Sequence, residues 1–172
     1  MKKRLCLILA VAAIGLCGCG NKDTNEGPSA AIVKEITCQE LLDTVLEKGE
    51  GLNTDSTLYY DAENYEELFK YLYDTSPDRA ADGAYAYASS AFADEVTIIR
   101  ATETDDVEVI KGHLEDRIDR RMQDFNGYKP EEVEKLENAV IDTYGRYVFM
   151  VVSENPQDII DIINEEIAKK DE

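Results

Sequence analysis

Six consecutive apolar residues, Tyr147 to Val152, constrain the fold more than any other part of the sequence. Successive side chains of a β-strand point to opposite faces of its sheet, so a strand without a polar residue is covered on both faces. The run therefore predicts a central strand. Residues 139–142 precede it across Thr143-Tyr144-Gly145, and the glycine at this turn predicts a β-hairpin.

Helical patterns surround the hairpin. Thr37 and Glu40 have the spacing of a capping box, and the stripe that follows has helical spacing: Cys38, Leu41, Leu42, Val45 and Leu46. This stripe directs Cys38 into the core. Further stripes predict helices from a cap at Asn64 to about residue 74, over 105–125, from Pro130, and from Asn155-Pro156 to the lysines near the C-terminus.

Two more strands are expected between the second and third helices. Residues 84–90 alternate aromatic and small side chains with a period of two, and residues 95–100 are rich in β-branched side chains. The element order is helix, helix, strand, strand, helix, helix, strand, strand, helix. This order predicts an α+β domain over residues 35–168, with an antiparallel sheet of about four strands packed by helices and a charged tail at 169–172.

The N-terminus has the pattern of a secretory signal. Three basic residues, Lys2, Lys3 and Arg4, precede a twelve-residue apolar run that is too short to span a bilayer. The run ends in Leu16-Cys17-Gly18-Cys19, which resembles the lipobox of bacterial lipoproteins. The resemblance departs from the usual pattern at Cys17, where alanine, serine or threonine is common.

The lipobox resemblance implies that Cys19 receives a diacylglyceryl group and that cleavage follows Gly18. Residues 1–18 would then be the signal peptide, and residues 19–34, which have no apolar periodicity, would be a tether. The membrane partner would be reached through the lipid, because the acidic domain would be repelled by an anionic membrane surface. Two alternatives are an ordinary secretory signal with another cleavage site and an uncleaved transmembrane anchor.

Composition excludes several function classes. The chain of 172 residues has 37 acidic and 18 basic residues and a formal net charge of -19, so it lacks the basic surface that nucleic acid requires. One histidine and the lack of nucleotide-binding motifs predict no metal centre and no cofactor. Ser89-Ser90 lacks the context of a hydrolase nucleophile. His113, the tyrosine pair at 85 and 87, and an acidic group are interpreted as structural; the acidic group comprises Asp61, Glu63, Glu66 and Glu67.

Arg117 stands out on the long helix over 105–125. A helical wheel places it at the edge of the apolar stripe, and its neighbours one turn away are His113 and Arg121 rather than acids. A buried guanidinium without an anion is costly. The hypothesis is an ion pair with Asp94 or Glu95. Two alternatives are a side chain whose head reaches water and a pocket that binds a ligand anion.

Four segments in order resemble an uncharacterised domain family of Firmicutes lipoproteins. They begin at Tyr85, Val109, Phe125 and Gly145, and the resemblance covers roughly residues 58–165. The resemblance implies a Gram-positive cell and a location on the outer face of the cytoplasmic membrane. The family has no assigned activity.

Two classes of function remain open. The first is a non-catalytic binding or interaction module whose partner is an envelope protein or a wall component. The second is an enzyme that acts on envelope material through a pair of carboxylates, since acids are abundant in this chain. No catalytic motif supports the second class, so we expect the first.

Overall fold

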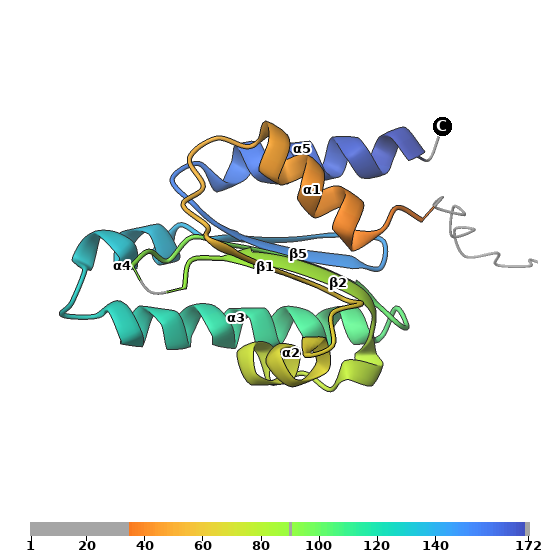
Figure 1. The fold of residues 1–172 in the computed structure, drawn as a ribbon, viewed down its shortest axis with the longest axis horizontal. Coiled ribbons are helices and arrows are strands. Elements are labelled where there is room, and N and C mark those ends of the chain that lie inside the picture. Colours follow the sequence, from red (N-terminus) through yellow and green to blue (C-terminus); the bar gives the residue numbers. More distant parts are fainter. Residues whose placement is uncertain (1–34, 90, 171–172) are drawn as a thin grey trace, which may run out of the picture. The chain divides into compact units, whose positions relative to one another are not determined.

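The computed structural model describes residues 35–89 and 91–170. These residues form one mixed α/β domain (Figure 1). Its elements in chain order are α1 (Cys38–Lys48), β1 (Ser56–Tyr59), α2 (Tyr65–Tyr73), the 3-10 turn η1 (Pro77–Arg79), β2 (Ala80–Tyr87), β3 (Glu95–Ala101), α3 (Asp106–Phe125), α4 (Pro130–Glu137), β4 (Val140–Tyr144), β5 (Tyr147–Val152) and α5 (Pro156–Lys170).

The strands form one antiparallel sheet in the order β1-β2-β3-β5-β4. Its five strands in the described residues correct the expected number of about four. The additional strand, β1, lies between α1 and α2, so it also corrects the expected element order, which had two helices in succession there. It is four residues long and buries only Leu58, so it has no alternating pattern that sequence could show. β5 lies between β3 and β4, and all six of its residues are buried, as its composition predicts.

Helices cover both faces of the sheet (Figure 1). α1 and α5 pack on one face, where Leu41, Val45 and Ile163 meet β-strand residues such as Phe149. α2 and α3 pack on the other face, in a second core that includes Ile110. The domain is therefore a three-layer structure with two separate apolar cores.

The sequence signals for helix ends and for the hairpin turn are confirmed at three positions and wrong at one. Thr37 accepts a hydrogen bond from the Glu40 amide and Glu40 caps Thr37 in return, so the capping box forms. Pro130 opens α4, and Gly145 has the left-handed φ of 58° that the hairpin turn requires. Asn64 makes no side-chain cap, because its φ and ψ of -103° and 11° are not extended.

The strand register defines two ends of the sheet. At one end, which we call the proximal end, Arg100 of β3 lies opposite Asp82 of β2 and Tyr147 of β5. At the distal end, Glu95 lies opposite Tyr87 and Val152. Arg100 follows Glu95 by five positions along the strand, which is about 17 Å at the usual rise. Among the described residues, no helix is long and apolar enough to cross a membrane.

Candidate functional site

The distal end holds a buried ion pair. Arg117 of α3 donates from Nη2 to Oε2 of Glu95 at 2.8 Å and from Nε to Oε1 at 3.2 Å, which is a two-bond arrangement. The Glu95 side chain is 1% exposed and that of Arg117 is 12% exposed. Of the two acids expected near Arg117, the structure therefore places Glu95 against its guanidinium.

The ion pair belongs to a larger polar network inside the core under α2 and α3. The Tyr73 hydroxyl donates to Glu95 Oε1 at 3.0 Å and lies 2.7 Å from the Thr97 hydroxyl. Burial lowers the pKa of Arg117, but the charge and hydrogen bonds of Glu95 outweigh this and raise it overall. Burial raises the pKa of Tyr73, so this phenol stays protonated. The network joins Tyr73 of α2 and Arg117 of α3 to Glu95 of β3 and so holds both helices to the sheet.

Asp94 has a different partner, Lys135 of α4. Asp94 Oδ2 accepts from Lys135 Nζ at 2.7 Å, and its side chain is fully buried. The same ammonium lies 3.2 Å from Glu132, whose Oε2 also accepts from the Ala93 amide at 2.7 Å. The neighbouring acids at the start of β3 thus bind different helices, and Asp94 fixes α4.

A polar pocket of about 310 Å³ opens beside this second cluster, between α4 and the residues that follow β5. We call it the distal pocket. Its lining consists of Glu131, Glu132, Glu134, Lys135, Asn138, Ser153 and Glu154. Ser153 is 1% exposed, and its hydroxyl oxygen has no hydrogen-bond partner within the described structure. Ser153 therefore lies at the wall of the pocket with a hydroxyl that is buried and makes no hydrogen bond within the described structure.

The sequence did not single out the residues of this pocket. Lys135 and Glu132 are three residues apart on a helix, a spacing typical of ordinary surface pairs. Ser153 follows a buried strand and carries no motif. The pocket forms where α4 lies beside the residues that follow β5. These two segments are separated in the sequence, so no local pattern predicts that they meet.

The other candidate residues from the sequence lie in surroundings that indicate a structural role and not a catalytic one. Ser89 donates from its amide and hydroxyl to Asp55 and has no histidine partner. Tyr85 is buried and packs against Tyr73 and Tyr87 in an aromatic cluster. His113 is half-buried on α3. No group of three or more potential metal ligands occurs in the described residues, the acidic group around Asp61 included.

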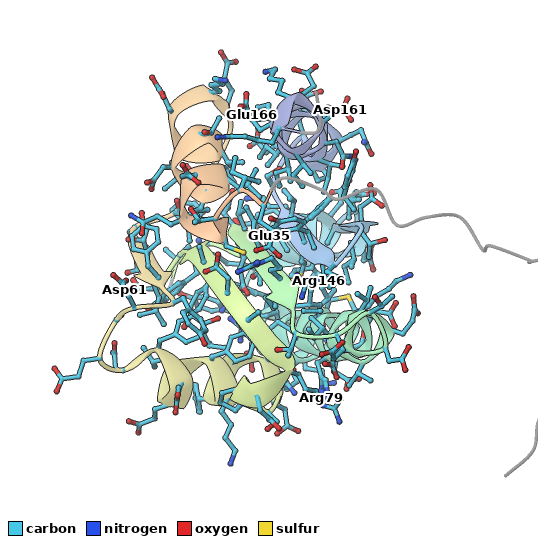
Figure 2. The ribbon with its side chains drawn as sticks, turned by 90° about the vertical axis from the view of Figure 1, so that its right-hand side faces the viewer. Glu35, Asp61, Arg79, Arg146, Asp161 and Glu166 are labelled. Carbon is cyan, nitrogen blue, oxygen red and sulfur yellow. The ribbon has the colours of Figure 1, made fainter. Side chains whose placement is uncertain are left out.

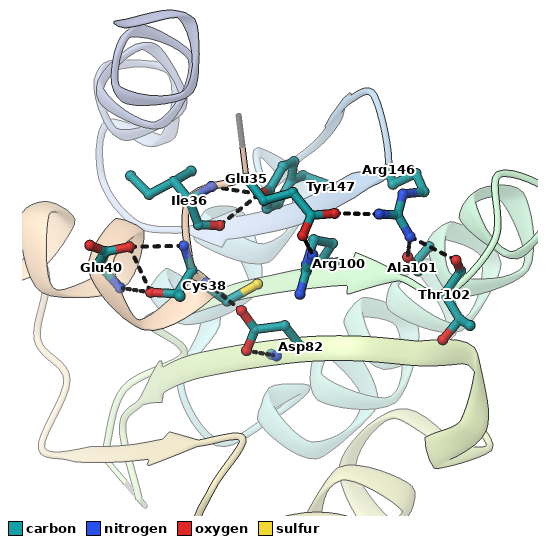
Figure 3. Close-up of polar contacts among 12 residues, drawn as sticks. Glu35, Ile36, Cys38, Glu40, Asp82, Arg100, Ala101, Thr102, Arg146 and Tyr147 are labelled. Atoms are coloured by element: carbon teal, nitrogen blue, oxygen red, sulfur yellow. Dashed lines mark hydrogen bonds and ion pairs between the residues drawn. The ribbon is translucent and has the colours of Figure 1, made fainter. Parts of the chain in front are cut away.

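The proximal end holds a second cluster, shown in Figure 3, that fixes the first described residues to the sheet. The Glu35 carboxylate pairs with both Arg100 and Arg146. The Tyr147 hydroxyl donates to the Ile36 carbonyl at 2.6 Å and accepts from the Ile36 amide at 3.1 Å. Figure 2 looks onto this end and labels Glu35 and Arg146. We call this cluster the proximal clamp.

Cys38 lies directly after the proximal clamp. Its amide donates to Asp82 Oδ2 at 2.8 Å, and the residue is fully buried in the core under α1, as its stripe predicts. Burial raises the pKa of the Cys38 thiol well above its usual value, and the nearby Asp82 charge adds to this. A thiol in such surroundings is unreactive. Cys19 and the cleavage position after Gly18 lie outside the described residues.

Comparison with known families finds a match to a domain of unknown function (DUF4358) over residues 55–153. The chain belongs to the DUF4358 family. The matched region is shorter than the range of the expected resemblance and contains all five described strands together with α2, α3 and α4. α1 and α5 lie outside it, although they cover one face of the sheet.

The DUF4358 description assigns no activity. No curated protein and no solved structure matches the chain.

Proposed function

We propose that this DUF4358 protein is a lipid-anchored, non-catalytic binding module on the outer face of the cytoplasmic membrane, and that it binds through its distal end. One observation carries the proposal. The distal pocket, with its unpartnered Ser153 hydroxyl, lies at the opposite end of the strands from Glu35, where the described chain begins. A domain tethered through its N-terminus would thus direct the pocket away from the lipid.

The proximal clamp supports this orientation. Glu35 and Ile36 are bound to the sheet by side chains of three residues, Arg100, Arg146 and Tyr147. The hydrogen bonds from Arg100, followed by those from Arg146, lower the pKa of Glu35, so the carboxylate stays charged. The tether would therefore leave the domain from a fixed point at the proximal end rather than from a loose segment.

Anchoring is tested with the two neighbouring thiols of the lipobox. Cys19→Ser should abolish incorporation of a fatty-acid analogue and leave an uncleaved precursor, since the Cys19 thiol is the attachment atom. Cys17→Ser is the matched control, and it should incorporate the label normally because it leaves the attachment atom in place. Labelling of the Cys19→Ser protein at the original level would overturn the anchoring proposal.

Binding is tested in intact cells with a photoreactive side chain at position 154, on the distal pocket. A discrete crosslinked species is expected from this position. A photoreactive side chain at position 67, on the exposed surface of α2, is the control and should give none. Equal crosslinking from both positions would contradict a binding role for the distal end.

The alternative is an enzyme that works through carboxylates. The gathering of Glu131, Glu134 and Glu154 in the distal pocket favours it, because glycoside hydrolysis uses two acids across one cleft. Against it, Glu132 is already bound by Lys135 and the Ala93 amide. The purified protein should release no soluble fragments from isolated cell-wall material. Release that is lost in Glu134→Gln would favour the enzyme.

A further inference from the structure

The strand β4 forms one edge of the sheet. It pairs with β5 on one side, and no described strand lies on its other side. None of its five residues is buried. An edge strand presents backbone N–H and C=O groups that can pair with a strand of another chain. The outer edge of β4 is therefore a place where two copies of this protein can join their sheets.

The strand register shows which backbone groups of β4 face outward. Tyr144 and Tyr147 close the two-residue hairpin turn and so form a hydrogen-bonded pair. Hydrogen-bonded pairs alternate with open pairs in an antiparallel ladder. The backbone of Asp142 therefore also bonds to β5, whereas Ile141 and Thr143 direct their backbone groups away from it. An added strand would bond at these two outward positions.

The Asp142 side chain engages one of the outward groups. Its Oδ1 accepts a hydrogen bond from the Thr143 amide at 2.8 Å. On the same face, Nδ2 of Asn164 in α5 lies 3.5 Å from Asp142 Oδ2. A strand that pairs with β4 needs the Thr143 amide as a donor, so it has to displace the carboxylate first.

Symmetry adds a second obstacle to pairing between two copies. Antiparallel pairing through the outward positions places Ile141 of one copy opposite Thr143 of the other, and Asp142 then lies opposite its own counterpart. This central pair is an open one, in which the two Cα atoms are about 4.5 Å apart and the side chains are close. Like charges directly opposite each other destabilise a sheet.

The surface beside this edge would otherwise favour association. A groove of about 650 Å³ lies between α3, the end of α4 and β4, and its lining includes half-buried apolar side chains: Ile118, Met122, Ala139 and Ile141. An added strand would cover these side chains, and burial of apolar surface favours association. The opposite edge of the sheet, β1, is only four residues long, and short edge strands are poor templates for pairing.

We propose that Asp142 protects the β4 edge and keeps it from pairing with the β4 edge of a second copy of this chain. The carboxylate acts in two ways: it binds the Thr143 amide, and it would face its own counterpart in the dimer. This inference concerns the sheet edge and is independent of the binding role proposed for the distal end.

Sedimentation equilibrium of the full-length protein in a density-matched detergent tests the protection. Asp142→Ala frees the amide and removes the opposed charges, so it should self-associate about tenfold more tightly than the unmodified protein. Asp161→Ala removes the same charge from an exposed position on α5 and is the matched control, which should sediment like the unmodified protein. Equal sedimentation of Asp142→Ala and the unmodified protein, or equal association of the two alanine variants, would overturn the inference.

Two further variants test the role of the hydrogen bond. Asp142→Asn keeps an acceptor for the Thr143 amide and removes only the charge, so it should associate more weakly than Asp142→Ala. Adding Thr143→Pro to Asp142→Ala removes the freed amide, and proline is tolerated on edge strands. This double variant should lose the association. A double variant that associates as tightly as Asp142→Ala, or an asparagine variant that does so, would overturn the role of the hydrogen bond.

Discussion

Asp94 and Glu95 are adjacent in the sequence, yet each binds a cation from a different helix. Adjacent residues at the start of a strand direct their side chains differently, so Glu95 meets Arg117 of α3 and Asp94 meets Lys135 of α4. Both ion pairs exclude most water. Pairs of this kind are costly to break, because the remaining charge stays buried without a partner.

The Arg117–Glu95 pair is expected to contribute strongly to stability. Arg117→Met and Glu95→Gln should each lower the free energy of unfolding by about 3 kcal/mol, and the double variant should lose less than the sum. Denaturant unfolding of the four proteins measures this coupling. The pair between Arg79 and Asp106, in which the Arg79 side chain is 44% exposed, is the control and should give a coupling below about 1 kcal/mol.

A coupling below about 0.5 kcal/mol for Arg117 and Glu95 would contradict the interpretation of a buried ion pair. It would favour the alternative in which the guanidinium is hydrated and only its aliphatic part contacts the core.

At the scale of elements, the packing of α2 on β2 depends on one glycine. A Cβ built at Gly83 would overlap the Tyr65 hydroxyl and lie 3.0 Å from Tyr65 Cζ. The same hydroxyl is buried without a hydrogen-bond partner in the described structure. The glycine therefore provides the space that the tyrosine occupies.

Gly83→Ala should destabilise the protein by about 2 kcal/mol, the usual range for an overpacked core. Tyr65→Phe removes the unpartnered hydroxyl and should be close to neutral. The double variant should recover part of the loss, because only the contact with the ring carbon remains. Thermal unfolding of the three variants measures this. A double variant no more stable than Gly83→Ala alone would contradict the steric explanation.

Glu166 joins α1 and α5 and makes their contact sensitive to acid (Figure 2). Hydrogen bonds from Lys48 and then Lys169 lower the pKa of Glu166 from 4.5 to about 2. Because the folded pKa lies below the unfolded value, the stabilisation is complete above about pH 4.5 and is lost as the pH falls towards 2.

Glu166→Gln should reduce the loss of unfolding free energy between pH 4.5 and pH 2. It should leave the pH dependence of the unfolding free energy above pH 4.5 unchanged. Denaturant unfolding between pH 2 and 7 measures it. Glu165→Gln, on the same helix, is the control and should keep the acid-dependent loss. A curve for Glu166→Gln that falls as steeply as that of the unmodified protein would contradict the assignment.

At the scale of the whole molecule, the DUF4358 region alone is too short to bury both faces of its sheet. Residues 55–153 include the complete sheet, but α1 and α5 supply the apolar cover on one face. Without them the sheet residues on that face would meet water: Ala84, Ala86, Val96, Ile98, Phe149 and Val151. An exposed apolar surface of this kind promotes association.

A fragment of residues 55–153 should therefore aggregate or unfold without a cooperative transition. A fragment of residues 35–172 retains both helices and the proximal clamp and should unfold cooperatively. Gel filtration and circular dichroism during heating compare the two. A monomeric 55–153 fragment with a sharp transition would show that α1 and α5 are accessories to a core that is complete without them.

The sequence determined the elements whose information is local. The all-apolar run of β5, the capping box at Thr37 and the helical stripe that buries Cys38 are visible in neighbouring residues, because period and cap chemistry depend on neighbours. Arg117 was also recognisable, since its own helix offers no acid one turn away. Sequence narrowed its partner to two adjacent residues, and only the strand geometry separated Glu95 from Asp94.

Tertiary structure alone decided the remaining features. β1 is short and shows no alternation, so it is a strand only because β2 provides hydrogen bonds beside it. The distal pocket joins α4 to Ser153 after β5, and the proximal clamp joins Glu35 to Arg146 across 111 positions. Such sites arise from contacts between distant segments. No periodicity or motif in either segment encodes the other, so their chemistry appears only when the chain is folded.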